Sequence, residues 1–204
     1  ASGAVALSLD PFVDTRWHRQ VIWLQPGLFL VHDQVTAKKE GYFEVSVNWR
    51  PKGKPDPWDG RVWVSRTTNS SLRLTPVSPE FFVRHDGEAG ILRQEKKIKL
   101  AENESVSAMS LLQAGGRSHE PVYEPRPISD NDLLLTAKDA SPIRVIFGPV
   151  DFPDLVSDAG ALVLRENCLE VMSATRLEMN GSCVLEADTP VSLSLKLNAN
   201  HALV

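Results

Sequence analysis

The sequence is poor in cysteine and tyrosine, with two residues of each among 204. Cys168 and Cys183 have no CxxC neighbour, which argues against a cysteine-based metal site. Two buried free thiols are the simplest interpretation, because free cysteine packs as a small hydrophobe. A disulfide between the two cysteines, which would imply an oxidising compartment, is the alternative.

Long apolar runs and a positive net charge are also absent. No run approaches the roughly 20 residues that a membrane-spanning helix needs, and the formal net charge is -4. We therefore predict neither a membrane partner nor a nucleic acid that is held by a broad basic surface. An acidic polymer stays open as a ligand, because a local basic patch is compatible with this net charge. The chain begins at Ala1 without a signal-peptide pattern, and we interpret it as a mature form or as a piece of a longer protein.

Helical periodicity is missing, and almost every patterned segment has the period of a strand. In the last of these, Val191, Leu193 and Leu195 alternate with polar residues, as in a half-buried strand. The dipeptide Asn180-Gly181 between two apolar runs predicts a tight hairpin. Only residues 151–160 leave room for one helical turn. We predict an all-β fold, a large two-sheet antiparallel β-sandwich of about 13 to 15 strands, with residues 1–204 as a single domain.

Residues 50–60 form a long polar loop that is rich in proline, glycine and lysine. Loops of this length in compact domains are usually functional or disordered. An exposed Trp58 in this loop can stack on a sugar ring, and Lys52, Lys54 and Arg61 can bind carboxylates or sulfates. These four residues are the predicted substrate-binding residues. In the alternative interpretation, Trp58 packs back on the sheet and anchors the loop.

Three segments together carry a recognisable pattern. They are Arg16-x-His18-Arg19-Gln20-Val21 with Pro26-Gly27 and Leu28–Asp33; Val45–Pro51, which ends in Trp49-Arg50-Pro51; and Glu95–Ala114, which contains Met109–Gln113. Over about residues 10–150 this pattern resembles the C-terminal β-domain of heparinase II/III-like polysaccharide lyases.

The resemblance implies a β-sandwich of the supersandwich type, the C-terminal part of a longer bacterial protein. It implies an α-helical toroid as the partner domain, an acidic polysaccharide as the ligand, and a periplasmic or secreted location. The function that follows is an accessory one, in which the domain scaffolds the lyase or contacts the polysaccharide. Two alternatives stay open: part of a lyase active site that the toroid completes, or a purely structural sandwich.

His18 and Asp33 are the candidate metal ligands. A hairpin that is symmetric about Pro26-Gly27 pairs Gln20 with Asp33, which places His18 and Asp33 on one sheet face as diagonal neighbours. In the resembled family, a His and an Asp of this sheet hold a structural zinc together with a further His.

The third ligand position of that zinc site reads Trp49-Arg50 here. An arginine stays protonated and is no ordinary zinc ligand. We therefore favour no cofactor, with either a hydrogen-bonded pair of His18 and Asp33 or an ion pair between Arg50 and Asp33 in place of the metal.

Residues 115–132 form a second predicted polar loop, with His119, Tyr123 and Arg126. The lyase chemistry that the resemblance implies removes a proton next to a carboxylate, which needs a base such as Tyr or His and a cation that neutralises the acid. These three residues are the candidate catalytic residues. The alternative is a solvated polar loop without a shared site. We expect that this chain alone is not an enzyme.

Overall fold

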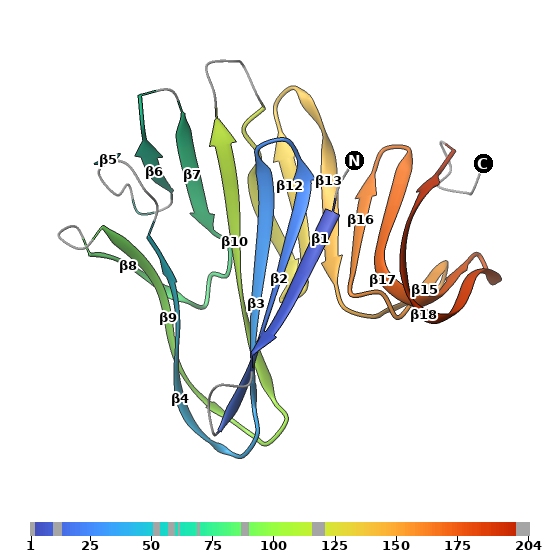
Figure 1. The fold of residues 1–204 in the computed structure, drawn as a ribbon, viewed down its shortest axis with the longest axis horizontal. Helices are drawn as coiled ribbons and strands as arrows, with labels where there is room; N and C mark the ends of the chain where they lie inside the picture. The colour runs from blue at the N-terminus through green and yellow to red at the C-terminus, as the bar shows by residue number, and fades with distance from the viewer. Residues whose placement is uncertain are drawn as a thin grey trace. The chain divides into compact units, whose positions relative to one another are not determined.

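The computed structural model describes residues 3–9, 14–50, 54–56, 60, 62–68, 70–86, 90–115 and 121–198. The chain divides into two compact units, Ala1–Glu120 and Pro121–Val204. Each unit consists of antiparallel strands (Figure 1). In the described residues no helix is long and apolar enough to span a membrane.

The first unit contains two sheets. The strands of its seven-stranded sheet follow the order β1-β2-β3-β10-β7-β6-β5, and those of its three-stranded sheet the order β4-β9-β8. The bounds are β1 (Gly3–Leu9), β2 (Thr15–Gln25), β3 (Leu28–Ala37), β4 (Gly41–Trp49), β5 (Lys54–Pro55), β6 (Trp63–Arg66), β7 (Ser71–Pro76), β8 (Phe82–Asp86), β9 (Ile91–Leu100) and β10 (Ser105–Gly115).

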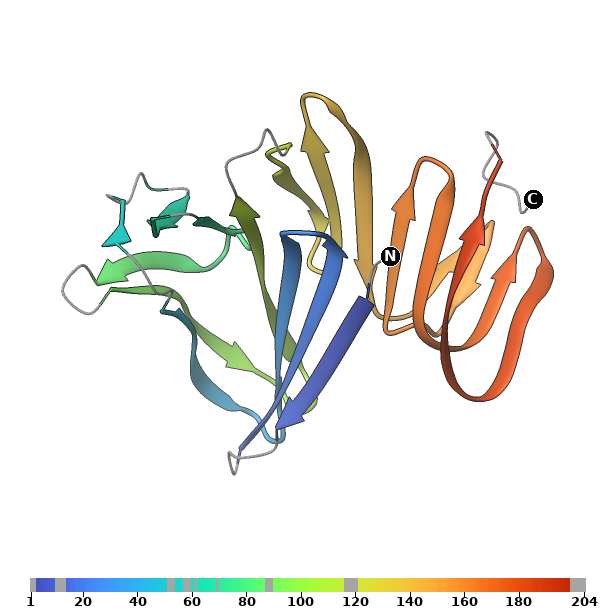
Figure 2. The same ribbon diagram turned by 45° about the horizontal axis from the view of Figure 1, so that its top comes forward.

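The two sheets of the first unit pack face to face (Figure 2). Alternating residues of each strand point between them, as the two-residue period of a strand requires. One buried cluster joins β3 and β10 to β4 and β9, together with Phe81 just before β8: Ala37, Val45, Val47, Phe81, Leu100, Val106 and Ala108. A second cluster, built on Trp63, Leu74 and Leu92, lies where β6 and β7 face β9.

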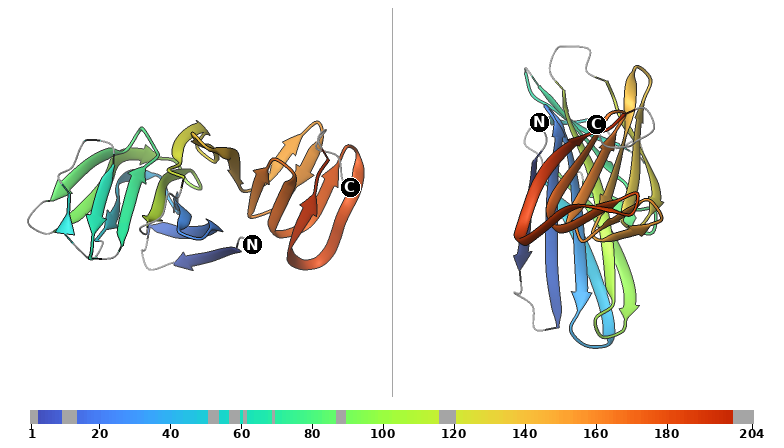
Figure 3. Two further views of the ribbon diagram at one scale, coloured as in Figure 1. Left: turned by 90° about the horizontal axis from the view of Figure 1, so that it is seen from above. Right: turned by 90° about the vertical axis from the view of Figure 1, so that its right-hand side faces the viewer.

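The second unit is one sheet of eight strands. Their order is β11-β12-β13-β16-β17-β15-β14, with β18 paired to the other side of β17 along its length (Figure 3). The bounds are β11 (Glu124–Ser129), β12 (Asp132–Ala137), β13 (Ala140–Phe147), β14 (Val150–Phe152), β15 (Leu155–Ser157), β16 (Ala161–Arg165), β17 (Cys168–Met179) and β18 (Ser182–Lys196).

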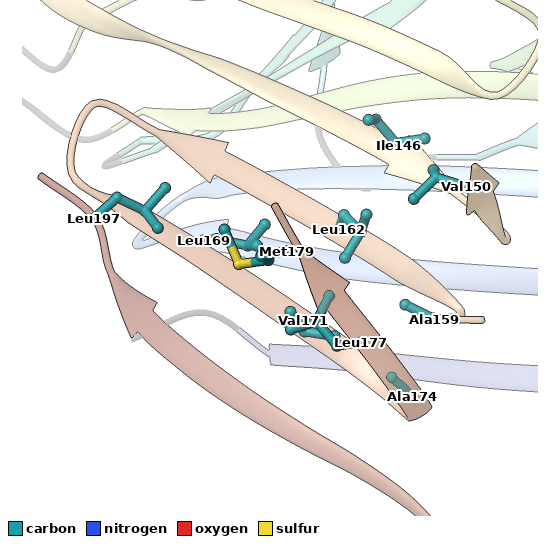
Figure 4. Close-up of a cluster of buried hydrophobic side chains, with 10 residues drawn as sticks. All are labelled: Ile146, Val150, Ala159, Leu162, Leu169, Val171, Ala174, Leu177, Met179 and Leu197. Atoms are coloured by element: carbon teal, nitrogen blue, oxygen red, sulfur yellow. The ribbon is translucent and has the colours of Figure 1, made fainter. Parts of the chain in front are cut away.

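The strand β17 changes partner halfway, and this change bends the sheet. Residues Cys168–Met172 pair with β16 and Leu177–Met179 with β15, with register shifts around Ala174. The bend wraps the sheet around its own core, which Figure 4 shows in close-up. The buried members of this core are Ile146, Val150, Ala159, Leu162, Leu169, Val171, Ala174, Leu177, Met179 and Leu197.

An aspartate between β15 and β16 satisfies the backbone at this bend. Asp158 accepts hydrogen bonds from the backbone N–H groups of Thr175 at 2.9 Å and Arg176 at 2.8 Å, and another from the Thr175 hydroxyl. The Thr175 hydroxyl above all, and then the Arg176 N–H, lower the pKa of Asp158 from its ordinary value. The carboxylate thus accepts hydrogen bonds from the backbone N–H groups at the point where β17 changes from pairing with β16 to pairing with β15.

The predicted all-β sandwich is confirmed, and its strands form three hydrogen-bonded sheets rather than two. The single-domain expectation for residues 1–204 stays a prediction. Residues 151–160, the one stretch with room for a helical turn, instead contain most of β14 and all of β15. Both cysteines are free thiols, as we favoured, but Cys183 is exposed and Cys168 only partly buried.

Candidate functional site

The register of β2 against β3 decides which side chains meet in the segment that carries the resemblance. Arg19 faces Asp33, and His18 faces Gln34. The predicted pairing of Gln20 with Asp33 is therefore wrong by one residue. A bulge between Trp23 and Gln25 inserts one residue into β2 near the turn, and a shift of one residue moves each side chain to the opposite sheet face.

Arg19, which is partly exposed, and the buried Asp33 form a two-pronged ion pair in the first unit. Arg19 donates from Nε to Oδ1 of Asp33 at 2.7 Å and from Nη2 to Oδ2 at 2.9 Å. Trp17 donates from its indole Nε1 to Oδ1 at 2.9 Å. The Asp33 side chain is 2% exposed. Both oxygens of this buried carboxylate therefore have charge-assisted or neutral donors within the protein.

Two indole rings flank the Arg19 guanidinium. Its central carbon lies 4.8 Å from the ring centroid of Trp17 and 5.3 Å from that of Trp49. Trp17 belongs to β2 in the larger sheet, and Trp49 to β4 in the smaller sheet. The arginine thus connects the two sheets. It makes an ion pair and a cation–π contact within the larger sheet, and a second cation–π contact with Trp49 of the smaller sheet.

This polar centre does not fit the metal site that the resemblance implies. His18 points to the sheet face opposite to that of Asp33, and the oxygens of Asp33 are held by Arg19 and Trp17. Within the described ranges, no three His, Cys, Asp or Glu residues are grouped so that they could hold a metal ion.

We also expected Arg50 as the possible cation on Asp33, and this identity is wrong. Arg50 is exposed just beyond the end of β4. The residue that takes this role is Arg19, three positions after Arg16 in the same motif. The kind of interaction, an arginine on the buried carboxylate, agrees with the sequence argument.

The candidate catalytic residues do not form one described cluster. Tyr123 is buried, with 4% of its surface exposed, just before β11. Arg126 is exposed on β11 itself, opposite Leu134 of β12. The predicted loop 115–132 thus contains a strand, and the loop assignment is wrong for Glu124–Ser129. His119 lies outside the described residues.

The candidate substrate-binding residues fall largely outside the described part of the chain. Trp58, Lys52 and Arg61 are not among the described residues. The backbone of Lys54 lies in β5, opposite Arg66 of β6, and its side chain is not described. The predicted sugar contact by Trp58 stays a prediction.

A second two-pronged pair occurs in the other unit. Arg144 donates from Nε to Oδ1 of Asp132 at 3.0 Å and from Nη2 to Oδ2 at 2.6 Å. The hydrogen bond to Asp132 raises the pKa of Arg144. The guanidinium carbon also lies 5.7 Å from the ring centroid of Phe152. Each unit therefore contains a buried aspartate that is held by an arginine, and this arginine also contacts an aromatic ring. We interpret this arrangement as one that stabilises the fold.

The sequence argument missed two strongly exposed aromatic residues. Tyr42 on β4 is 86% exposed and Phe82 on β8 is 69% exposed. Both lie on the side of the three-stranded sheet that faces away from the core, because their neighbours Phe43 and Val83 pack inward. The two-residue alternation of Phe81-Phe82-Val83, with Phe81 buried, is the signal that could have found Phe82.

No family model and no curated protein matches this chain. The solved structures to which this chain is similar include a heparan sulfate lyase and two heparinase III structures. The heparan sulfate lyase HepC from Pedobacter heparinus has 12% sequence identity and a TM-score of 0.49, over 67% of this chain and 24% of that one. The heparinase III-BT4657 gene product has 12% identity and a TM-score of 0.47, over 95% and 26%. The crystal structure of heparinase III has 10% identity and a TM-score of 0.43, over 96% and 26%. This chain spans about a quarter of the length of each of them.

Proposed function

We propose that this chain is an accessory, non-catalytic β-sandwich domain of a heparinase II/III-like polysaccharide lyase. It scaffolds the lyase beside an α-helical toroid domain and contacts an acidic polysaccharide. The protein is then bacterial, and it works in the periplasm or outside the cell. The proposal rests on the sequence pattern over about residues 10–150, in which Arg19 and Asp33 occupy the polar centre.

The state of Asp33 is the observation that carries the accessory role. A carboxylate available for proton transfer or metal binding needs at least one oxygen that is free of internal donors. Asp33 instead accepts three hydrogen bonds from Arg19 and Trp17 and is buried. The most distinctive motif of the chain therefore supports packing between two sheets rather than chemistry.

The described candidate for a general base supports the same conclusion. Tyr123 is 4% exposed, whereas a base has to come within hydrogen-bond distance of the proton that it removes. Arg126, the proposed cation, is exposed on an edge strand. In the alternative, Tyr123 and His119 belong to a lyase site that the toroid completes. Loss of the longer protein's activity in Y123F, with the fold intact, would favour that alternative over ours.

Affinity electrophoresis of this chain tests the proposal. Gels would contain heparin, polygalacturonate or neutral dextran, each at low and at moderate salt. We expect retardation by the acidic polymers that weakens as salt increases, because salt screens the exposed charges. Retardation by no acidic polymer, or equal retardation by dextran, would contradict the proposed contact with acidic polysaccharide.

A further inference from the structure

The solvent side of the three-stranded sheet β4-β9-β8, here called the outer face, combines exposed aromatic and cationic side chains. Inward residues such as Val83 and Gln94 pack toward the core, so the alternating positions point outward. On β8 these outward positions include Phe82 and Arg84, and on β9 they include Arg93. A flat, pleated surface of this kind can accept an extended ligand along its strands.

Phe82 is the apolar element of this surface. Its side chain is 69% exposed at the start of the edge strand β8, opposite Glu95 of β9. An aromatic ring lying open on a flat surface offers the same kind of contact as the platforms that stack on planar ligands. The apolar C–H face of a sugar ring matches it.

Two arginines directly oppose one another beside Phe82. Arg84 of β8 pairs in register with Arg93 of β9, and like charges in directly opposite positions destabilise a sheet. Arg84 has no ion pair within the described ranges. Among the described residues, the one ion pair of Arg93 is a long contact to Glu95 at 3.9 Å, and its buried Nε finds no hydrogen-bond partner there. An anion between the two guanidinium groups would relieve this repulsion.

The charge of the outer face agrees with an anionic ligand. The described outward side chains of the three strands include four cations, Arg84, Arg93, Lys97 and Lys99, and two carboxylates, Glu44 and Glu95. Glu40, just before β4, adds a third carboxylate through its ion pair with Lys99. The chain as a whole has a net charge of -4, so this excess of positive charge is local. Lys97 and Lys99 are engaged with Glu44 at 3.6 Å and with Glu40 at 2.5 Å, which leaves the two arginines as the cations for an incoming acid group.

We propose that Phe82, Arg84 and Arg93 form a subsite for one acidic sugar residue of a polysaccharide. The sugar ring stacks on Phe82, and its carboxylate or sulfate lies between the two planar guanidinium groups, which form paired hydrogen bonds with such oxyanions. This inference rests on the proposed function, because it places the polysaccharide contact of that proposal on a particular surface. It also differs from the loop contact that Trp58 would make.

The test compares F82A and R84Q with two matched variants in the other unit. F152A removes a partly exposed phenylalanine, and K138Q removes one exposed positive charge. Binding of the full chain to heparin and to polygalacturonate is measured by affinity electrophoresis and titration calorimetry. The first polymer carries sulfates and carboxylates and the second only carboxylates, so the pair identifies the acid group.

We expect F82A and R84Q each to weaken binding by about 5- to 20-fold, the range of one stacked ring or one charge-assisted contact. F152A and K138Q should stay within about 2-fold, the size of a general charge effect. R84Q should also leave the melting temperature unchanged or higher, because it removes a like-charge pair. A residue with a merely structural role would lower it.

The remaining outcomes separate the two proposals. If the wild-type chain binds an acidic polymer and F82A and R84Q bind as well as their controls, the subsite is wrong and the proposed function stands. If the wild-type chain binds neither polymer, both proposals fail together.

Discussion

Arg19 and Asp33 lie directly opposite one another on β2 and β3, and each prong of the guanidinium reaches its own carboxylate oxygen. A buried ion pair of this kind contributes to stability only when its geometry offsets the cost of removing both charges from water. Here the geometry is two-pronged, and Trp17 supplies a third hydrogen bond. The pair therefore ties β2 to β3 within the larger sheet, and the contact of Arg19 with Trp49 of β4 reaches the smaller sheet.

Removing one partner of this pair should destabilise the protein strongly. R19M leaves the Asp33 carboxylate buried without its cation, and we expect a loss of about 3 kcal/mol in the free energy of unfolding. The double variant R19M/D33L replaces both charges with apolar groups, and it should recover most of this loss. Urea unfolding of the three proteins measures these differences.

Two outcomes would contradict this account of the pair. One is an R19M variant as stable as the wild type, and the other is a double variant no more stable than R19M. Arg19 occupies the position at Asp33 that a metal ion would take. A chelator should therefore not shift the melting temperature of the wild-type protein. A chelator-dependent fall would indicate a metal that contributes to the fold.

The bend of β17 should be sensitive to acid through Asp158. The pKa of Asp158 is lowered in the folded protein from its ordinary value of 3.8. The ionised carboxylate therefore contributes its full stabilisation above pH 3.8, and this contribution is lost as the pH falls through the lowered pKa. D158N should therefore melt at a lower temperature than the wild type at pH 7. The difference should shrink once the pH falls below 3.8. Melting curves across this range check it, and a difference that does not depend on pH would contradict the role of the carboxylate.

A polar bridge in the core of the first unit offers a further test. Gln94 donates from Nε2 to the hydroxyl of Ser110 across the two sheets, while no described residue bonds to its Oε1. S110A should cost about 1 to 3 kcal/mol, because it leaves the buried amide without its acceptor. Q94M/S110A should restore the stability of the wild type or exceed it. Chemical denaturation measures the stability of both variants. If the two residues acted independently, the double variant would be the least stable of the proteins, which would contradict this account of the bridge.

The single-domain prediction can be tested with one core variant in each unit. L92A acts in the first unit and L162A in the second, both at fully buried positions, and each should cost about 2 to 5 kcal/mol. If residues 1–204 unfold as one domain, calorimetry will show one transition that both variants shift. Two transitions, each shifted by one variant only, would contradict the single-domain prediction.

The parts of the fold that could be predicted are those in which local chemistry decides the structure. The Asn180-Gly181 hairpin is present with both central residues at positive φ, 50° and 73°, as such a two-residue turn requires. By contrast, β11 contains Pro125 and Pro127 and was predicted as loop. Proline is tolerated there because β11 is at the edge of its sheet and, among the described strands, pairs with β12 alone.

The candidate site was harder to predict because its register depends on one inserted residue. Val21–Leu24 and Leu28–Val31 are apolar on both faces, so their pattern does not show which residues oppose each other. The bulge between Trp23 and Gln25 exchanges Gln20 for Arg19 opposite Asp33. A one-residue uncertainty that the sequence cannot resolve thus separates a predicted His and Asp pair from the observed Arg and Asp pair.

The central claim is that this chain contacts acidic polysaccharide without cleaving it. The most direct test incubates the chain with heparin and with polygalacturonate at concentrations that give measurable binding. Retention and the ultraviolet absorbance of the unsaturated uronate product are then recorded in the same samples. We predict salt-sensitive retention with no increase in absorbance. An increase in absorbance, or the absence of retention by either polymer, would contradict the account.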